Sequence, residues 1–372
     1  MRWIWLVNLA AVVVLVSAAV GTGGGCGPTI SEDETSTESV VTTNTAQGVQ
    51  ENAVLCGQGT PPCQLCSANG ANCVNLATGI LGTEINAVMV VGEANPTSIA
   101  RAIANLTLGN VSNRSVDLVD MTRRAVTTSI AIQGGPNAMD SSGTGRQLAV
   151  ASATGNAITL INLDTVQIER TIPLTPGTQP TSVCYAKAGD TERLFACGEG
   201  GCDMIDNGRS TPLGIGRGQV SCGGDYAVVA NPLEGLVFFD PMTGERRDLM
   251  ALPGVTACYD SEDGECIYCL VPRTPGGCHL VGINVDENRE FGRVAIDGTC
   301  TLVTGTTTSN TIAVATETSG AGRLTQFTRN LVQTSSQATR VAQSVAFPPL
   351  NPATAAAAAG IPPTLPPPRG NR

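Results

Sequence analysis

Residues 134–172 read GGPNAMDSSGTGRQLAVASATGNAITLINLDTVQIERTI. This stretch contains three short apolar runs, at residues 147–151, 157–161 and 166–172, which are separated by Gly, Asn, Asp and Thr. Short runs rich in Val, Ile and Leu between turn-forming residues are typical of β-strands. A turn at Pro136 followed by another short run completes a unit of four predicted strands.

The same unit recurs along the chain. Apolar residues followed by Asp, Asn or Thr end the third predicted strand of each copy, at intervals of 34 to 44 residues: Asp120, Asn162, Asp206, Asp240, Asn284 and Thr328. Four strands in about 42 residues, repeated six times, predict an all-β fold, a β-propeller with six four-stranded blades. A seventh, degenerate blade is the alternative. The strand that closes the ring is expected from residues 87–91 or 341–347.

One repeat also shows a family likeness. Gly134-Gly135-Pro136, Gln147–Ala151 and Gly155–Asn162 resemble a YVTN-type propeller repeat, a unit common in bacterial surface proteins. The resemblance is good across residues 134–172 and faint in the other copies. It implies a bacterial propeller, often with seven blades.

The composition excludes several functions. The net charge is −10, which argues against a nucleic-acid-binding protein. A single histidine, His279, and a single lysine, Lys187, leave little material for a catalytic triad, a multi-histidine metal site or a Schiff base. Aromatic residues make up only 3% of the chain, so few large side chains are available to fill the spaces between blades.

Residues 1–26 have the pattern of an export signal: Arg2, an apolar stretch and small residues before Cys26. Gly23-Gly24-Gly25-Cys26 resembles a bacterial lipobox, which implies that Cys26 is lipidated, although Gly23 stands where that pattern has Leu. The alternatives are a cleaved signal with Cys26 in a disulfide, or an uncleaved apolar anchor. All three predict an extracytoplasmic protein facing the periplasm or the cell surface.

The rest of the chain divides by composition. Residues 27–55 are an acidic, Ser/Thr-rich linker, and residues 56–85 are expected to form a small Cys-rich cap. The propeller is assigned to residues 86–348. Residues 349–372 form an Ala/Pro-rich tail.

The fourteen cysteines predict a disulfide framework in an exported chain. Two sets of four, 72 to 78 residues apart, each take the same places along one blade and the first strand of the next, and they predict two equivalent sets of disulfides. An N-terminal cluster of four predicts two more disulfides, a zinc knuckle being the alternative. Cys26 and Cys266 remain, so lipidation of Cys26 makes Cys266 the unpaired thiol. The cysteines assigned to disulfides are Cys56, Cys63, Cys66, Cys73, Cys184, Cys197, Cys202, Cys222, Cys258, Cys269, Cys278 and Cys300.

One disulfide can be predicted from a turn. Asp263-Gly264 is a strong hairpin signal, and a turn centred there places Cys258 directly opposite Cys269. Directly opposed residues are close enough for a disulfide. The sequence therefore predicts a Cys258–Cys269 bond and, by analogy, a Cys184–Cys197 bond across a longer hairpin.

No catalytic, cofactor-binding or metal-ligating residue is predicted. The recurring Asp and Asn residues are expected to cap turns, the acidic run 260–265 to form a solvated hairpin turn, and residues 214–218 to link blades. The sequence favours a lipid-anchored, non-enzymatic binding or scaffold module at the cell envelope, with an unidentified protein or small ligand on one propeller face and no nucleic acid. The alternative is a metal-dependent, lactonase-like hydrolase with a site in the propeller channel.

Overall fold

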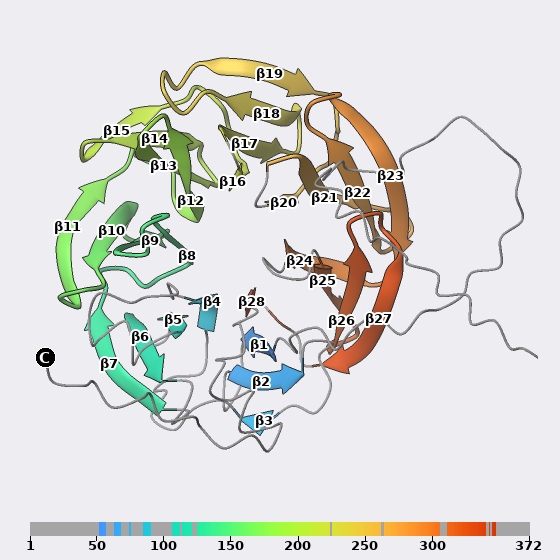
Figure 1. Cartoon of the computed structure of the whole chain (residues 1–372), viewed down its shortest axis with the longest axis horizontal. Coiled ribbons are helices and arrows are strands. Elements are labelled where there is room, and N and C mark those ends of the chain that lie inside the picture. Colours follow the sequence, from blue (N-terminus) through green and yellow to red (C-terminus); the bar gives the residue numbers. More distant parts are fainter. Residues whose placement is uncertain are drawn as a thin grey trace, which may run out of the picture.

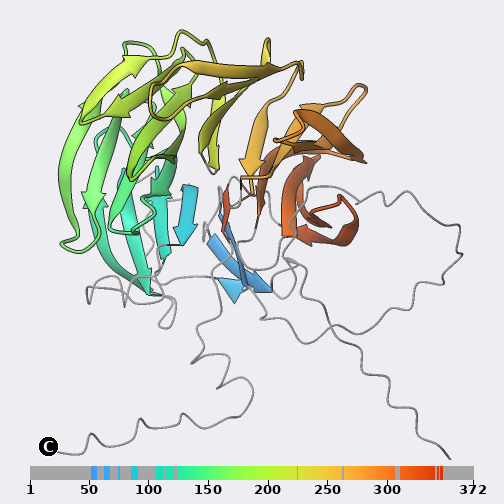
Figure 2. The same ribbon diagram turned by 45° about the horizontal axis from the view of Figure 1, so that its top comes forward.

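The computed structural model describes residues 52–56, 63–67, 74–75, 85–90, 106–111, 114–120, 125–223, 225–261, 264–305, 311–339, 342 and 344–346. These residues form seven four-stranded antiparallel sheets arranged around a central axis (Figure 1). In the tilted view the sheets stand as blades side by side (Figure 2). The predicted all-β propeller fold is confirmed.

Six blades are each built from four consecutive strands, in the order that the repeats predict. The first strand of each lies nearest the axis and the fourth lies at the rim (Figure 1). Blade 1 contains β4 (Ile85–Val90), β5 (Leu106–Asn110), β6 (Ser115–Asp120) and β7 (Ala125–Ala131); blade 2 contains β8 (Ala138–Ser141), β9 (Gln147–Ser152), β10 (Ala157–Asn162) and β11 (Gln167–Pro173); blade 3 contains β12 (Pro180–Ala188), β13 (Thr191–Gly198), β14 (Cys202–Asp206) and β15 (Arg209–Pro212). Blade 4 contains β16 (Gln219–Gly223), β17 (Tyr226–Asn231), β18 (Gly235–Phe239) and β19 (Arg246–Met250); blade 5 contains β20 (Ala257–Asp260), β21 (Cys266–Pro272), β22 (Cys278–Asn284) and β23 (Arg289–Ile296); blade 6 contains β24 (Thr299–Gly305), β25 (Thr311–Thr318), β26 (Ala321–Thr328) and β27 (Gln333–Thr339).

The seventh blade joins the two ends of the propeller. Its strands are β1 (Asn52–Cys56), β2 (Cys63–Ser67), β3 (Val74–Asn75) and β28 (Ser344–Ala346), and β28 pairs antiparallel with β1. The closing strand thus comes from the 341–347 candidate, because residues 87–91 belong mostly to β4 of blade 1. The expected six-blade count is corrected to seven. Two strands of the predicted cap, β2 and β3, belong to this sheet, and β1 begins at Asn52, inside the predicted linker. The Cys-rich segment is therefore part of the propeller.

Apolar side chains fill the spaces between neighbouring blades. The five core clusters of the described residues each span two consecutive blades, from blades 1 and 2 through to blades 5 and 6. Val, Ile, Leu and Ala supply most of this core, and the largest completely buried side chains include Tyr268, Phe195, Phe239 and Phe327. The blades are therefore held together by many small contacts and a few aromatic rings.

Three of the recurring Asn and Asp residues, Asn162, Asp240 and Asn284, cap turns, as the sequence predicts. The Asn162 side-chain oxygen accepts hydrogen bonds from the backbone N–H groups of Asp164 and Thr165, and Asp240 does the same for Met242 and Thr243. Asn284 accepts one from Glu287.

Asp206 acts differently. It begins the tight hairpin between β14 and β15, where Asn207 and Gly208 both have positive φ, and its carboxylate lies 3.4 Å from the Arg193 guanidinium. The Asp120 side chain lies outside the described residues.

Candidate functional site

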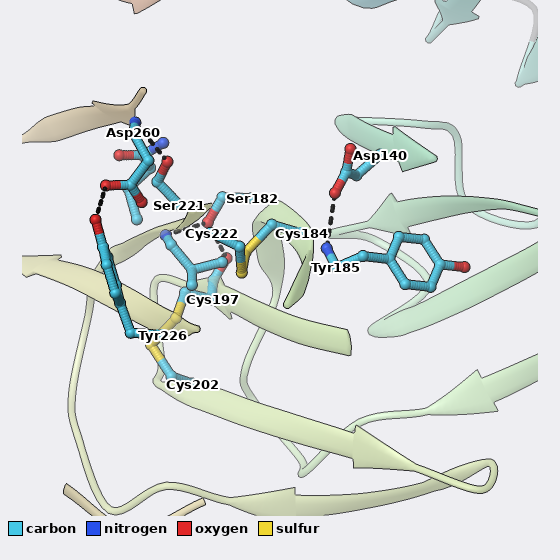
Figure 3. The surroundings of a disulfide bond; sticks show 12 residues. Asp140, Ser182, Cys184, Tyr185, Cys197, Cys202, Ser221, Cys222, Tyr226 and Asp260 are labelled. Atoms are coloured by element: carbon cyan, nitrogen blue, oxygen red, sulfur yellow. Dashed lines mark hydrogen bonds between the residues drawn. A yellow bond between two sulfur atoms is a disulfide. The ribbon is translucent and has the colours of Figure 1, made fainter. Parts of the chain in front are cut away.

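The inner strands of blades 2 to 5 form the region where polar side chains of different blades meet near the axis (Figure 3). Each inner strand is the edge of its sheet, so one side of its backbone has no strand partner. Side chains of the neighbouring blade occupy this side and form hydrogen bonds with it. We call this region, from Asp140 to Asp260, the inner polar belt.

Blades 2 and 3 meet at Asp140 on β8. Its carboxylate accepts hydrogen bonds from the backbone N–H groups of Tyr185, at 2.7 Å, and Ser141, at 2.9 Å. Burial raises the pKa of Asp140 to about 7, because the two hydrogen bonds only partly offset the desolvation of the charge and Glu192 adds repulsion. The Tyr185 hydroxyl donates to Gln147, and burial, with Asp140 nearby, raises the pKa of Tyr185.

Blades 3 and 4 are joined by a covalent bond and a hydrogen bond. The Cys184–Cys222 disulfide connects β12 to β16, with the two Cα atoms 5.7 Å apart (Figure 3). Beside it, the Ser182 hydroxyl accepts a hydrogen bond from the backbone N–H of Val220 at 2.9 Å and lies 3.2 Å from the carbonyl oxygen of Cys197.

Blades 4 and 5 meet at Asp260, the last residue of β20, whose side chain is only 5% exposed. The Tyr226 hydroxyl donates to Oδ1 at 3.1 Å, and the backbone N–H of Asp260 donates to the Ser221 hydroxyl at 3.2 Å (Figure 3). Among the described residues, Oδ2 has no hydrogen-bond partner. Burial raises the pKa of Asp260 to about 7, and the bonds to Tyr226 and Ser221 moderate that rise.

Asp260 is buried and Asp140 is partly buried, and each carboxyl group can hold or release a proton near neutral pH because its pKa is raised to about 7. They belong to blades 2 and 5, and each is bonded within its own inter-blade contact, so they do not form a pair like that of a glycosidase or an aspartic protease. Within the described part of the chain, no group of three His, Cys, Asp or Glu side chains could hold a metal ion. Most hydrogen bonds of the inner polar belt described above, together with its disulfide, join two neighbouring blades.

The disulfides confirm one predicted pairing and correct another. Cys258 is bonded to Cys269, and the strand register Tyr259↔Tyr268 and Asp260↔Ile267 is the one that the turn predicts. The Glu262 and Asp263 positions of that turn lie outside the described residues. Cys184, in contrast, is not bonded to Cys197.

The register of blade 3 explains this difference. The two-residue turn at Gly189-Asp190 pairs Ala188 with Thr191, and this register places Cys184 opposite Phe195. Cys197 faces Cys202 on the other side of β13. Cys197 and Cys202 therefore form a disulfide, which leaves Cys184 for Cys222. In blade 5 the equivalent residue, Cys269, faces Val281 on that side, and Cys278 is bonded to Cys300 of the next blade.

The remaining cysteines whose side chains are described, Cys56, Cys63 and Cys266, are also disulfide-bonded. Cys56 is bonded to Cys63 across the β1–β2 hairpin, whereas Cys26 and the side chains of Cys66 and Cys73 lie outside the described residues. Cys266 is disulfide-bonded too, so the expectation that it is the unpaired thiol is wrong. Its partner is not among the described side chains. The Arg329 guanidinium lies 3.2 Å from its sulfur atom.

The structure also places the histidine, the Gly-rich segment and the acidic run that the sequence singles out. His279 is on β22 opposite Val271 and Ala295, and residues 214–218 connect β15 to β16 as a blade linker. Asp260 departs from its expected place in a solvated turn, because it is buried against blade 4. Asp140 was not predicted as a site residue, because its only signal in the sequence is a carboxylate at the end of a predicted first strand.

Several disulfides in one folded chain are typical of an oxidising, extracytoplasmic compartment. No helix in the part of the chain that the structure describes is long and apolar enough to cross a membrane.

No protein-family model and no curated protein sequence matches the chain. Solved structures do share its fold. A "putative 6-phosphogluconolactonase" from Bacteroides uniformis is 14% identical with a TM-score of 0.59, and the match covers 80% of this chain and 100% of that one. A protein of the same description from Bacteroides fragilis is 13% identical with a TM-score of 0.55, covering 82% of this chain and 99% of that one. The RRP9 WD40 repeats are 10% identical with a TM-score of 0.55, covering 72% of this chain and 84% of theirs. These similarities establish the class, a β-propeller protein, and concern the fold alone.

Proposed function

We propose that this protein is an exported, lipid-anchored propeller that serves as a non-enzymatic binding or scaffold module at the cell envelope. The observation that supports this best is that the polar groups of the inner polar belt form bonds between blades. Its carboxyl groups and hydroxyl groups bond to the neighbouring blade, and a disulfide joins two of the inner strands. Such bonds make a rigid ring, which suits a protein that presents surfaces to partners.

The disulfides support a location at the cell envelope, and lipidation of Cys26 would restrict which other cysteines can be paired. Fourteen cysteines can all pair, but a lipid on the sulfur of Cys26 leaves an odd number for disulfides. Because Cys266 is bonded to a cysteine outside the described side chains, lipidation of Cys26 requires that either Cys66 or Cys73 stays unpaired. Lipid attachment and the pairing of Cys266 can therefore be tested together.

The anchor is tested with the Cys26→Ser variant in a bacterial host that makes lipoproteins. The unchanged protein should incorporate labelled palmitate and stay with the membrane fraction, and the variant should do neither. Cys63→Ser is the matched control, since it removes a cysteine from the β1–β2 hairpin and should leave lipid incorporation intact. Membrane retention of an unprocessed Cys26→Ser protein would show an uncleaved apolar anchor instead.

The second candidate is a lactonase-like hydrolase with a metal in the propeller channel. It is suggested by the two Bacteroides proteins of the same fold, each named as a "putative 6-phosphogluconolactonase", and by the Oδ2 atom of Asp260, which has no hydrogen-bond partner among the described residues. Metal analysis of the purified protein, combined with a lactone-hydrolysis assay with and without EDTA, separates the two. Stoichiometric divalent metal and EDTA-sensitive hydrolysis would replace the scaffold proposal. Unchanged melting with EDTA and no hydrolysis supports it.

A further inference from the structure

A cavity of about 440 Å³ lies between blades 5 and 6, away from the inner polar belt. Its walls come from the end of β23, the turn between β25 and β26, and the strands β26 and β27. In Figure 1 these strands lie at the right of the ring, with β23 above β26 and β27. The cavity thus opens between the outer parts of two neighbouring blades.

The cavity follows from the small side chains that line it. Neighbouring blades diverge from the axis, so large side chains are needed to fill the gap near the rim. Closer to the axis, Tyr268 and Phe327 belong to the core between these blades. Nearer the rim, the walls contain Ala295, Gly322 and Ala338, which leave the space open.

The strand register brings four residues to one face of blade 6. Arg323 pairs with Ala338, and Thr325 pairs with Ser336. Residues two apart on a strand share a face, so all four belong to the same wall. The Arg323 guanidinium donates to the Ser336 hydroxyl at 3.1 Å, and that hydroxyl lies 3.1 Å from the Thr325 hydroxyl.

The charge of the cavity is unusual for this acidic protein. Among the described residues, Arg323 forms no ion pair, although the chain carries a net charge of −10. The carboxylate at the rim, Asp297, is 98% exposed and forms an ion pair with the Arg273 guanidinium at 2.7 Å. The exposed Arg323 is therefore the cation in the cavity wall, and it lies beside hydroxyl groups.

We propose that this cavity binds a small hydroxylated monocarboxylate, which is the chemistry of a sugar acid. A guanidinium group pairs with a carboxylate through two parallel hydrogen bonds. Thr318, Thr325 and Ser336 supply hydroxyl groups, and Gln333 supplies an amide, for the hydroxyl groups of such a ligand. The cavity wall contains a single arginine, Arg323, which favours a ligand with one negative charge over a ligand with two. The volume lies in the range of small-molecule sites, roughly 300–1,000 Å³.

This site is independent of the lipid anchor and of any chemistry in the channel.

The test is isothermal titration calorimetry of the purified protein with glucuronate, with glucose as the neutral probe and glucose 6-phosphate as the dianionic probe. Glucuronate should bind at one site per chain, and the other two should bind at least about tenfold more weakly.

Two variants locate the binding. Arg323→Gln should weaken glucuronate binding about tenfold or more, because it removes the charge and the bidentate geometry. Ala338→Trp should block the cavity by filling it and keeps the arginine. Arg217→Gln is the matched control, since this exposed arginine lies in the linker between blades 3 and 4 and should leave binding unchanged.

Three results would overturn the proposal. The first is the absence of saturable binding heat with glucuronate in a protein sample that is shown to be folded by its cooperative melting. The second is equal affinity in the unchanged protein and Arg323→Gln. The third is tighter binding of glucose 6-phosphate than of glucuronate, which would mean that the cavity selects a dianion.

Discussion

Replacing Asp260 with Asn should stabilise the protein at alkaline pH. In the folded protein the carboxyl group is 5% exposed, Oδ1 accepts a hydrogen bond from Tyr226, and burial raises the pKa from 3.8 to about 7. Asn keeps an oxygen for the Tyr226 hydroxyl and carries no charge, so it resembles the protonated acid. The variant therefore does not incur the cost of deprotonating a buried carboxyl group.

The sign of the pH dependence follows from the two pKa values. Between about pH 4 and pH 7 the folded state holds a proton at Asp260 that the unfolded state has lost, so the free energy of unfolding falls as the pH rises. The contribution is fully present below the unfolded value and is lost once the pH passes the folded one. A pKa that is raised by about 3 changes the free energy of unfolding by about 4 kcal/mol at most between low and high pH. Asp260→Asn should be similar to the unchanged protein near pH 4 and more stable by up to about 4 kcal/mol at pH 8.

The assay is urea denaturation at pH 4, 6 and 8 with the disulfides intact, followed by far-UV circular dichroism. Asp225→Asn is the matched control, because it makes the same chemical change on an exposed residue of blade 4 and should show no comparable pH-dependent gain. The reasoning is refuted if Asp260→Asn is less stable than the unchanged protein at pH 8. A stability difference that stays constant from pH 4 to pH 8 would refute it too.

The remaining predictions concern the same junctions between blades. Tyr226→Phe should lower the free energy of unfolding by about 1–2 kcal/mol at pH 6 and raise the pKa of Asp260 further, which the pH profile of unfolding measures; an unchanged profile contradicts the hydrogen bond. Replacing both Cys184 and Cys222 with Ser should cost about 2–4 kcal/mol in urea denaturation, and a cost near zero would mean that the inter-blade disulfide does not form. Peptide mapping without reduction should find Cys266 joined to another cysteine, whereas alkylation of Cys266 in the unreduced, unfolded chain would show that it is a free thiol.

The repeat pattern determined most of the fold by itself. Strands alternate with turn residues in every copy, and the Asn or Asp at the end of the third strand caps a turn through its own side chain, as at Asn162 and Asp240. These are local interactions, so their signal is contained in short stretches of sequence. The Cys258–Cys269 bond was predictable for the same reason, because one short hairpin fixes its register.

The seventh blade could not be predicted from the repeat pattern. Its strands come from both ends of the propeller, β28 supplies only three residues and β3 only two. Such short strands carry almost no periodicity. Their place becomes defined only when the ring closes and β28 pairs with β1.

The candidate site depended even more on tertiary structure. The sequence places Asp140 and Asp260 near the ends of first strands, but burial by the neighbouring blade is what raises each pKa to about 7. The two sets of four cysteines take equivalent places along the chain, yet the β12–β13 hairpin places Cys184 opposite Phe195, whereas the hairpin of blade 5 places Cys258 opposite Cys269. Blade 3 therefore has a different disulfide pairing from blade 5. The sequence by itself thus determined the repeats, the turns and the disulfide within one short hairpin, because each depends on neighbours in the chain. The contacts between blades, the partners of the other cysteines and the open cavity at Arg323 were decided by how the blades pack, because each needs residues that are distant in sequence.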